Sequence, residues 1–181
     1  VGLKGTDGEM HQKALALGAE PVTPKRTRDL LAHIQHMEEL SLLVAPGEMG
    51  EHHVEGLGVS FEVVGEIGRE TSAEDTKRIA REMVDRGIGL LIFVGGDGTA
   101  RDIYDAVDST VPVVGVPAGV KVFSAAFAVS ARAAAEMVDA FLQGTELTEE
   151  EVLDIDEDAF REGRLASRLY GYLQVPNVKN L

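Results

Sequence analysis

The chain has 181 residues, carries a formal net charge of −14 and lacks cysteine and tryptophan. The acidic balance excludes non-specific binding to nucleic acid, which needs a basic surface, and the missing cysteines exclude disulfides and thiolate metal sites. No apolar run is long enough to span a bilayer and no signal-peptide pattern opens the sequence, so we expect a cytoplasmic protein that does not contact membranes.

The first third of the chain predicts short helices and strands in alternation. Residues 1–8 form a glycine-rich loop with no strand before it, so we expect a first strand upstream of this sequence. A short helix is predicted over 10–17 and a second from Pro24 to about Met37. The next elements are a buried strand over 40–45, a short helix over 51–57 and a strand near a sheet edge over 59–64.

The middle of the chain continues this alternation around one apolar run. A hydroxyl followed by an acid at 71–75 predicts a capping box that starts a helix reaching Gly87. Five consecutive apolar residues at 90–94 predict a strand buried on both faces, with the next helix beginning at about Thr99. A further strand over 111–116 and an alanine-rich helix over 131–142 follow.

This order of elements predicts an α/β fold with a parallel, doubly wound, Rossmann-like sheet. Towards the end, two segments with alternating apolar residues, at 151–156 and 164–175, are typical of antiparallel strands. We therefore expect an α/β domain over 1–146 and the beginning of a β-rich second domain over 147–181, which the sequence truncates.

The central apolar run leads directly into Gly95-Gly96-Asp97-Gly98-Thr99. Glycines permit a tight turn and a close approach to a ligand, and the free N–H groups of a following helix attract anions. Asp97 adds a carboxylate that an anion site alone would not need, which favours a general base or a Mg²⁺ ligand. The alternative interpretation is a tight strand-to-helix turn without a ligand.

A second special turn, over 117–124, follows the next strand. Because the carboxyl ends of parallel strands meet at one edge of a sheet, we expect both turns to face one crevice. Gly119 and Lys121 are candidate phosphate contacts, although Lys121 fits an ordinary surface position equally well. Ser124 is expected to cap the next helix or to bind a ligand, and capping is the favoured interpretation.

Three further polar residues are candidates for nucleotide binding. Arg101 lies one turn into the predicted helix and is expected either to reach a phosphate or to pair with Asp102. Lys4 and Thr6 lie in the glycine-rich first loop, which either lines the same crevice or is a mobile terminal loop.

Histidines at 33, 36, 52 and 53 raise the question of a metal site. The first two have a spacing that permits two ligands on one helix face, but no third ligand follows by spacing. We therefore favour surface histidines and assign no residue as a metal ligand.

The two turns together resemble a known superfamily. Residues 95–99 after a hydrophobic strand are similar to the signature of the NAD kinase and diacylglycerol kinase superfamily, and residues 115–119 resemble its second glycine loop. More narrowly, residues 96–102 and 117–125 resemble the ATP-NAD kinase-like group, which includes the acetoin-catabolism X proteins.

The resemblance implies the fold of an NAD kinase N-terminal domain and a kinase that uses ATP, or polyphosphate, and Mg²⁺. Its acceptor would be a hydroxyl of a nucleotide, NAD first, with NADP as the product. Asp97 would activate that hydroxyl, and the phosphate-binding turn would comprise Gly95, Gly96, Gly98 and Thr99. We also expect the protein to form a homo-oligomer.

Two departures from the family pattern leave the acceptor open. NAD kinases carry an Asn-Glu pair that holds the nicotinamide nucleotide, and no Asn-Glu dipeptide occurs in this sequence. Lipid kinases of the superfamily carry Gly-Thr-Gly-Asn in the second loop, where residues 120–123 differ. The alternatives are a kinase for another small hydroxyl compound and a non-catalytic nucleotide-binding protein of acetoin-type catabolism.

Overall fold

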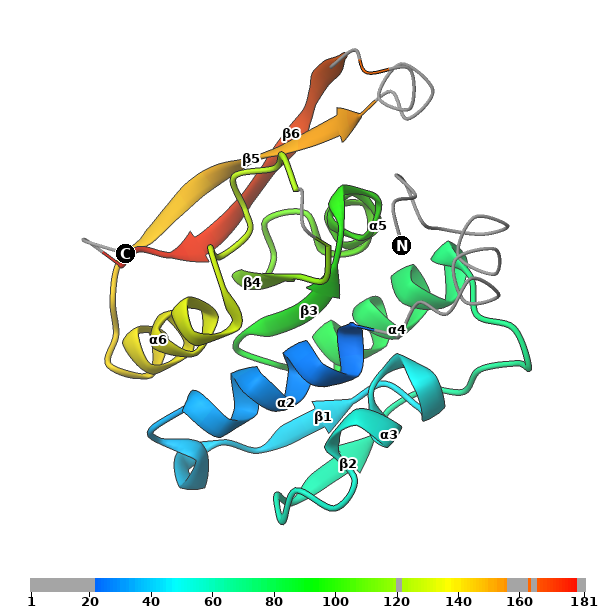
Figure 1. Cartoon of the computed structure of the whole chain (residues 1–181), viewed down its shortest axis with the longest axis vertical. Coiled ribbons are helices and arrows are strands. Elements are labelled where there is room, and N and C mark those ends of the chain that lie inside the picture. Colours follow the sequence, from blue (N-terminus) through cyan, green and yellow to red (C-terminus); the bar gives the residue numbers. More distant parts are fainter. Residues whose placement is uncertain (1–21, 120–121, 156–162, 164–165, 179–181) are drawn as a thin grey trace.

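The computed structural model describes residues 22–119, 122–155, 163 and 166–178 (Figure 1). The predicted helix over 10–17 and the first glycine-rich loop lie outside these residues. The helices and strands are α2 (Thr23–His33), β1 (Leu42–Val44), α3 (Glu51–Val54), β2 (Phe61–Val63), α4 (Ala73–Asp85), β3 (Leu91–Gly95), α5 (Asp97–Val107), β4 (Val113–Pro117), α6 (Ala131–Leu142), β5 (Leu147–Ile155) and β6 (Ser167–Pro176), with single 3₁₀ turns at Met37–Glu39 and Gly47–Met49.

The strands form three pairs. β1 pairs with β2 and β3 with β4, both in parallel, whereas β5 and β6 form an antiparallel hairpin. Helices combined with parallel strands confirm the predicted α/β class. Within the described residues no ladder joins the β1–β2 pair to the β3–β4 pair, so the continuous doubly wound, Rossmann-like sheet remains a prediction.

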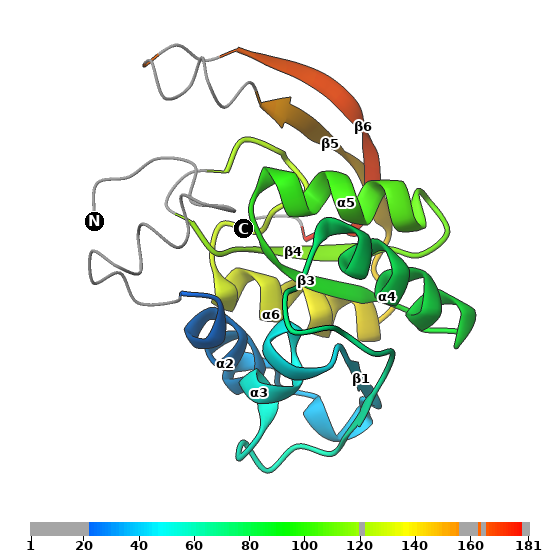
Figure 2. The ribbon, with the colours of Figure 1, turned by 90° about the vertical axis from the view of Figure 1, so that its right-hand side faces the viewer.

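The β3–β4 pair is buried between two layers, as its apolar run predicted (Figure 2). Leu91 and Phe93 of β3 face α4, α5 and the hairpin, while Ile92 and Val94 face α2 and α6. Alternate side chains of a strand point to opposite faces, so a continuous apolar run is what a strand covered on both sides requires. Because both faces of β3 are buried, the core also sets the position of its carboxyl end, where α5 begins.

Local capping signals set two of the helix starts. The capping box is formed as predicted, with Ser72 N donating to Asp75 Oδ2 at 3.0 Å and Asp75 N donating to Ser72 Oγ at 3.4 Å. The start of α6 is capped by Ser130, whose Oγ accepts from Ala133 N at 3.1 Å. The favoured assignment of Ser124 as the cap of this helix was therefore wrong.

Several boundaries differ from the prediction, and three of them have an evident structural setting. α2 ends at His33 rather than near Met37, because the next amides, of Gln35 and His36, donate to the Asp139 carboxylate of α6. The buried strand expected over 40–45 is reduced to β1, whose three residues are only half-buried. α5 begins at Asp97 rather than at Thr99, since Gly96 takes the extended conformation of an N-cap.

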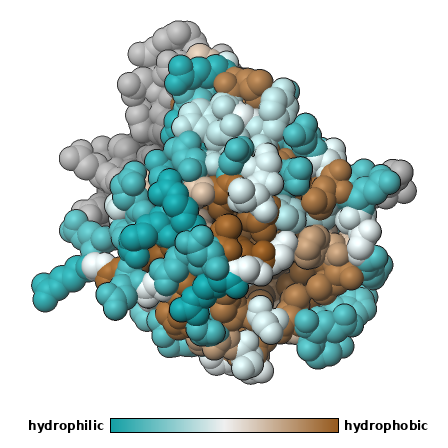
Figure 3. Space-filling model, turned by 180° about the vertical axis from the view of Figure 1, so that it is seen from behind, coloured by the Kyte–Doolittle hydropathy of each residue, from teal (hydrophilic) through white to brown (hydrophobic). Residues whose placement is uncertain are grey.

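The β5–β6 hairpin shares the core of the α/β part. Val152, Leu173 and Val175 are buried in the same cluster as Phe93 and Ile103. The opposite face of the hairpin is exposed, and the domain boundary at 146 remains a prediction. In the view from behind, apolar side chains gather at the centre and lower part of the surface among hydrophilic ones (Figure 3). No described helix is both long and apolar enough to cross a membrane.

Gly115 of β4 lies between two aromatic rings. An added Cβ would come within 2.9 Å of the Phe127 and Phe93 rings and 3.0 Å of the Ala126 carbonyl oxygen. We expect Gly115→Ala to lower the free energy of unfolding by about 1–3 kcal/mol through overpacking. Urea denaturation checks this. Gly68→Ala is the matched control, because its Cβ would meet no atom closer than 3.9 Å; equal losses in the two variants would contradict the prediction.

The Asp139 carboxylate ties α6 to the segment that follows α2, and it does so partly through His36. The 3.1 Å hydrogen bond from His36 Nδ1 to Asp139 raises the pKa of His36 above its usual 6.5. A histidine with a raised folded-state pKa stabilises the fold below pH 6.5 and loses this contribution as pH rises through the raised value.

We therefore expect His36→Gln to destabilise the protein more at pH 5.5 than at pH 8, values chosen at least about one pH unit to either side of the usual histidine pKa. Thermal unfolding of wild type and variant at both values measures the difference. His33→Gln, at the exposed end of the preceding helix α2, is the control. If His36→Gln lowers the stability equally at both pH values, the ion pair between His36 and Asp139 does not contribute to the stability of the fold.

Candidate functional site

The first turn is shaped by Gly95. A Cβ at this buried position would lie 2.4 Å from Thr99 Oγ1 and 2.6 Å from Thr99 Cβ. Only glycine therefore allows the backbone at position 95 to pack against the first helical turn of α5. At Gly96 the added atom would meet nothing within 4 Å. The N-cap residue of α5, Gly96, has no side chain to bind the first amides of the helix, and the N-terminus of a helix attracts anions.

The second turn lies directly beside the first. Gly95 is in register with Pro117, and Ala118 N donates to Gly95 O at 2.9 Å. Gly119, the next residue, is exposed. The structure thus brings the two sequence motifs to one edge of the β3–β4 pair, as the parallel arrangement predicts.

The Asp97 carboxylate joins the two turns. Oδ1 accepts from Ser124 N at 2.8 Å, from Ser124 Oγ at 2.5 Å and from Phe123 N at 3.2 Å. Among the described residues, Oδ2 accepts from the shared Phe123 amide alone, at 3.0 Å. A carboxylate oxygen offers about two lone pairs, so Oδ1 is saturated and Oδ2 retains capacity for a further partner. Because Asp97 is half-buried, its carboxylate lies at the rim of the turn, outside the core.

Ser124 is buried behind Asp97, with 5% of its surface exposed. Its Oγ donates to Asp97 and accepts from Leu153 N of β5 at 3.0 Å. Ser124 therefore contacts the predicted functional carboxylate, and a ligand contact of its own stays a prediction. The Phe123 and Leu153 amides were not anticipated, because backbone donors leave no signal in side-chain chemistry.

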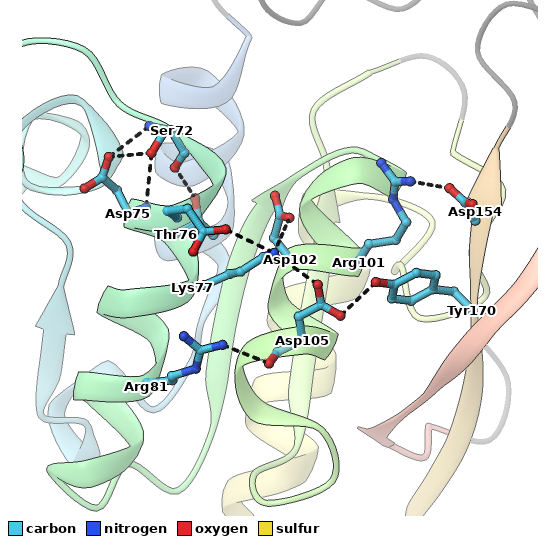
Figure 4. A network of polar contacts seen from close by, with 11 residues as sticks. Ser72, Asp75, Thr76, Lys77, Arg81, Arg101, Asp102, Asp105, Asp154 and Tyr170 are labelled. Carbon is cyan, nitrogen blue, oxygen red and sulfur yellow. Dashed lines mark hydrogen bonds and ion pairs between the residues drawn. The ribbon is translucent and has the colours of Figure 1, made fainter.

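Arg101 points to the hairpin, where it pairs with Asp154 of β5 (Figure 4). Asp154 also pairs with Arg168, at 2.8 Å. The alternative pairing of Arg101 with Asp102 is not formed, since Asp102 lies near Lys77, 3.9 Å away. The guanidinium nevertheless lies close to the turn, because a Cβ added at Gly98 would be 3.8 Å from Arg101 Nη2. A phosphate contact from Arg101 therefore stays a prediction. Lys4, Thr6 and Lys121 lie outside the described residues.

A polar network behind the site holds α5 between α4 and the hairpin (Figure 4). Asp105 is its centre: Lys77 Nζ lies 3.1 Å from Oδ2, and Tyr170 donates its hydroxyl to Oδ1 at 2.8 Å. The hydrogen bonds to Asp105 raise the pKa of both Lys77 and Tyr170. Burial raises the pKa of Asp102. These contacts fix the helix whose first turn carries Asp97.

The histidines are engaged elsewhere. His33 Nδ1 lies 2.6 Å from the Asp29 carbonyl oxygen, His52 Nδ1 lies 3.1 Å from Glu48, and His36 contacts Asp139. His53 is 5% exposed, so the prediction of surface histidines was wrong at this position. Burial lowers the pKa of His53, as expected for a histidine packed against α2.

The chemistry of the turn fits a nucleotide that carries Mg²⁺ on its phosphates. The space beside Gly96 is open, and the uncapped amides of α5 begin at the next residue. In the described part of the chain, no three histidine or acidic side chains converge on a metal position. Mg²⁺ is usually held by one or two carboxylates together with substrate phosphates, and Asp97 is the carboxylate in the first turn of α5.

A glycine turn that opens a helix at the carboxyl end of a buried parallel strand is typical of α/β proteins that bind phosphate groups. The family model of the ATP-NAD kinase N-terminal domain matches residues 12–146. The chain belongs to this NAD kinase-like family, and its domain supports a kinase-type, phosphotransferase function. Searches of curated proteins and of solved structures give no match.

Proposed function

We propose that this protein is an ATP-dependent kinase that transfers a phosphoryl group to a nucleotide hydroxyl, with the ribose hydroxyl of NAD as the first candidate acceptor. The observation that carries the proposal is the position of Asp97. Its carboxylate lies at the start of α5, with Oδ1 held by the second turn and Oδ2 accepting a single shared donor from the described residues.

Phosphoryl transfer depends on positioning and charge stabilisation more than on covalent chemistry by the protein. In the proposed reaction the acceptor hydroxyl oxygen bonds to the terminal phosphorus, the bond to the leaving diphosphate oxygen breaks, and the hydroxyl proton passes to Asp97 Oδ2. The amides at the start of α5 would hold the phosphate oxygens. Mg²⁺, when bound, would neutralise part of the phosphate charge.

The charge distribution supports a metal-assisted reaction. The whole chain carries a net charge of −14, and Arg101, the cation nearest in sequence to the turn, is paired with Asp154. Polyphosphate binding would therefore rely on amide dipoles and a bound cation. Lys121, which belongs to the second turn, is a further candidate.

A second candidate function is a kinase of the same fold with another small hydroxyl acceptor. The absence of an Asn-Glu dipeptide from this sequence favours it, since that pair holds the nicotinamide nucleotide in the NAD kinases that the motifs resemble. A non-catalytic nucleotide-binding protein would use the same turn without turnover.

The test uses the purified full-length protein with ATP and Mg²⁺ and a panel of acceptors that includes NAD, small diols and sugar-like compounds. ADP release would be measured for every acceptor and NADP formation for NAD. We expect ADP release that depends on the acceptor, with NADP as the product. ADP release with another acceptor would support the second candidate, and calorimetric binding of ATP without turnover would overturn both.

A further inference from the structure

Ser124 connects two parts of the molecule that are distant in the sequence. Its hydroxyl donates to Asp97 Oδ1 at 2.5 Å and accepts from Leu153 N at 3.0 Å. Asp97 opens α5, whereas Leu153 belongs to β5 of the hairpin. The side chain is buried, with 5% of its surface exposed, so water does not replace either partner readily.

The Leu153 amide that reaches Ser124 lies beside an irregularity in the hairpin. Val152 is opposite Gly171 and Leu153 is opposite Leu169, so the register shifts between Val152 and Leu153 and leaves Tyr170 without an opposite residue. In a β-bulge the extra residue of the bulged strand is left unpaired and the strand bends. The extra residue here belongs to β6, and Leu153, which follows the shift on β5, donates from the edge of β5 to Ser124.

A neighbouring bond holds the second turn against the same strand. Ala125 N donates to Glu151 O at 2.8 Å, next to the contact between Ser124 and Leu153. The segment 122–125 is therefore clamped between the start of α5 and β5. A change in the position of β5 would be passed to this segment.

The donor from Leu153 also sets the direction of the serine hydroxyl. A hydroxyl has one proton to donate and two lone pairs that accept. Since Leu153 N can only donate, Ser124 Oγ accepts from it and directs its own proton to Asp97. The result is a fixed order of donors, from the Leu153 amide through the Ser124 hydroxyl to Asp97 Oδ1.

We propose that Ser124 is a positioning residue, through which the β5–β6 hairpin orients the Asp97 carboxylate for proton transfer. This inference rests on the proposed kinase function. Ser124, held by the hairpin, helps to saturate Oδ1 and leaves Oδ2 for the substrate. The hairpin therefore contributes to the geometry of the site. Neither the motifs nor the family match assigns this role to the hairpin.

The test compares Ser124→Ala, Ser124→Thr and the double variant Asp97→Asn/Ser124→Ala in the full-length protein. Loss of a hydrogen bond to a charged group predicts a fall in kcat of about tenfold to a hundredfold for Ser124→Ala, with KM for ATP nearly unchanged. Threonine retains the hydroxyl and should recover most of the rate. Because Ser124 acts through Asp97, the double variant should be no slower than Asp97→Asn alone.

Ser130→Ala is the matched control, since Ser130 caps α6 and does not contact Asp97. It should lower Tm but leave kcat unchanged. Additive losses in the double variant, or a Ser124→Ala protein that loses stability and keeps its kcat, would overturn the proposal.

Amide hydrogen exchange distinguishes a failure of this inference from a failure of the kinase assignment. The wild type could lack phosphoryl transfer activity while Ser124→Ala still increases exchange at the Leu153 and Phe123 amides. That result would support the structural link from the hairpin to Asp97 and would contradict the proposed kinase reaction. Unchanged exchange at both amides would remove the link itself.

Discussion

The Asp97→Asn protein should transfer phosphoryl groups about 10²–10⁴-fold more slowly than the wild type, which is the usual contribution of a positioned general base. Asparagine keeps an oxygen that can accept from Ser124, so the second turn retains its main anchor. It replaces the other carboxylate oxygen with an amide that cannot take a proton. The loss should therefore appear in kcat, with KM for ATP changed much less.

Single-turnover kinetics with saturating ATP and acceptor measure the chemical step directly. Asp102→Asn is the matched control, because it makes the same change on the same helix at a residue whose nearest ionic partner is Lys77, 3.9 Å away. We expect this control to retain its rate. Equal rates in Asp97→Asn and wild type would exclude Asp97 from the mechanism, and calorimetry would show whether ATP still binds.

Among substitutions in the Gly95–Thr99 turn that keep every polar side chain, we expect Gly95→Ala to cause the largest loss of stability and activity. The new Cβ would lie 2.4–2.9 Å from three side-chain atoms of Thr99, a β-branched residue in the first turn of α5 that cannot rotate away freely. We expect a loss of about 1–3 kcal/mol in the free energy of unfolding, as for other overpacked sites. The displaced amides should also lower kcat/KM by about a hundredfold.

Gly96→Ala separates the ligand-binding effect from the steric one. Its Cβ would enter open space, and the backbone at Gly96 is extended (φ −118°), so alanine fits without strain. If phosphate occupies that space, this variant should keep its Tm and bind ATP more weakly. Urea denaturation and calorimetry on both variants provide the comparison. Unchanged ATP affinity in Gly96→Ala would place the phosphate elsewhere.

Much of the local structure could be predicted from the sequence, because it depends on neighbouring residues. The Ser72–Asp75 capping box is a local pattern, and the structure forms it. Alternation of apolar residues also predicted the antiparallel strands β5 and β6. Boundaries failed where distant groups intervened, as at the end of α2, where the amides bind Asp139, about a hundred positions further along.

The candidate site was predictable as a set of motifs but not as a set of contacts. The glycine turn, its acid and the second turn are each visible in sequence, and the match over residues 12–146 shows the family that the motifs indicated. The structure pairs Ser124 with Leu153 as well as with Asp97, and pairs Arg101 with Asp154, and neither Leu153 nor Asp154 belongs to the motifs.

The sequence by itself therefore determined the α/β class, the turn at the end of β3 and the family, since each depends on residues that are adjacent or regularly spaced. Only the tertiary structure decided which groups surround the Asp97 carboxylate. Its donors come from positions 26 and 27 residues away, and Ser124 is bound in turn by an amide 29 residues further on. Such contacts depend on how β3, β4 and the hairpin pack, and packing is a property of the whole core.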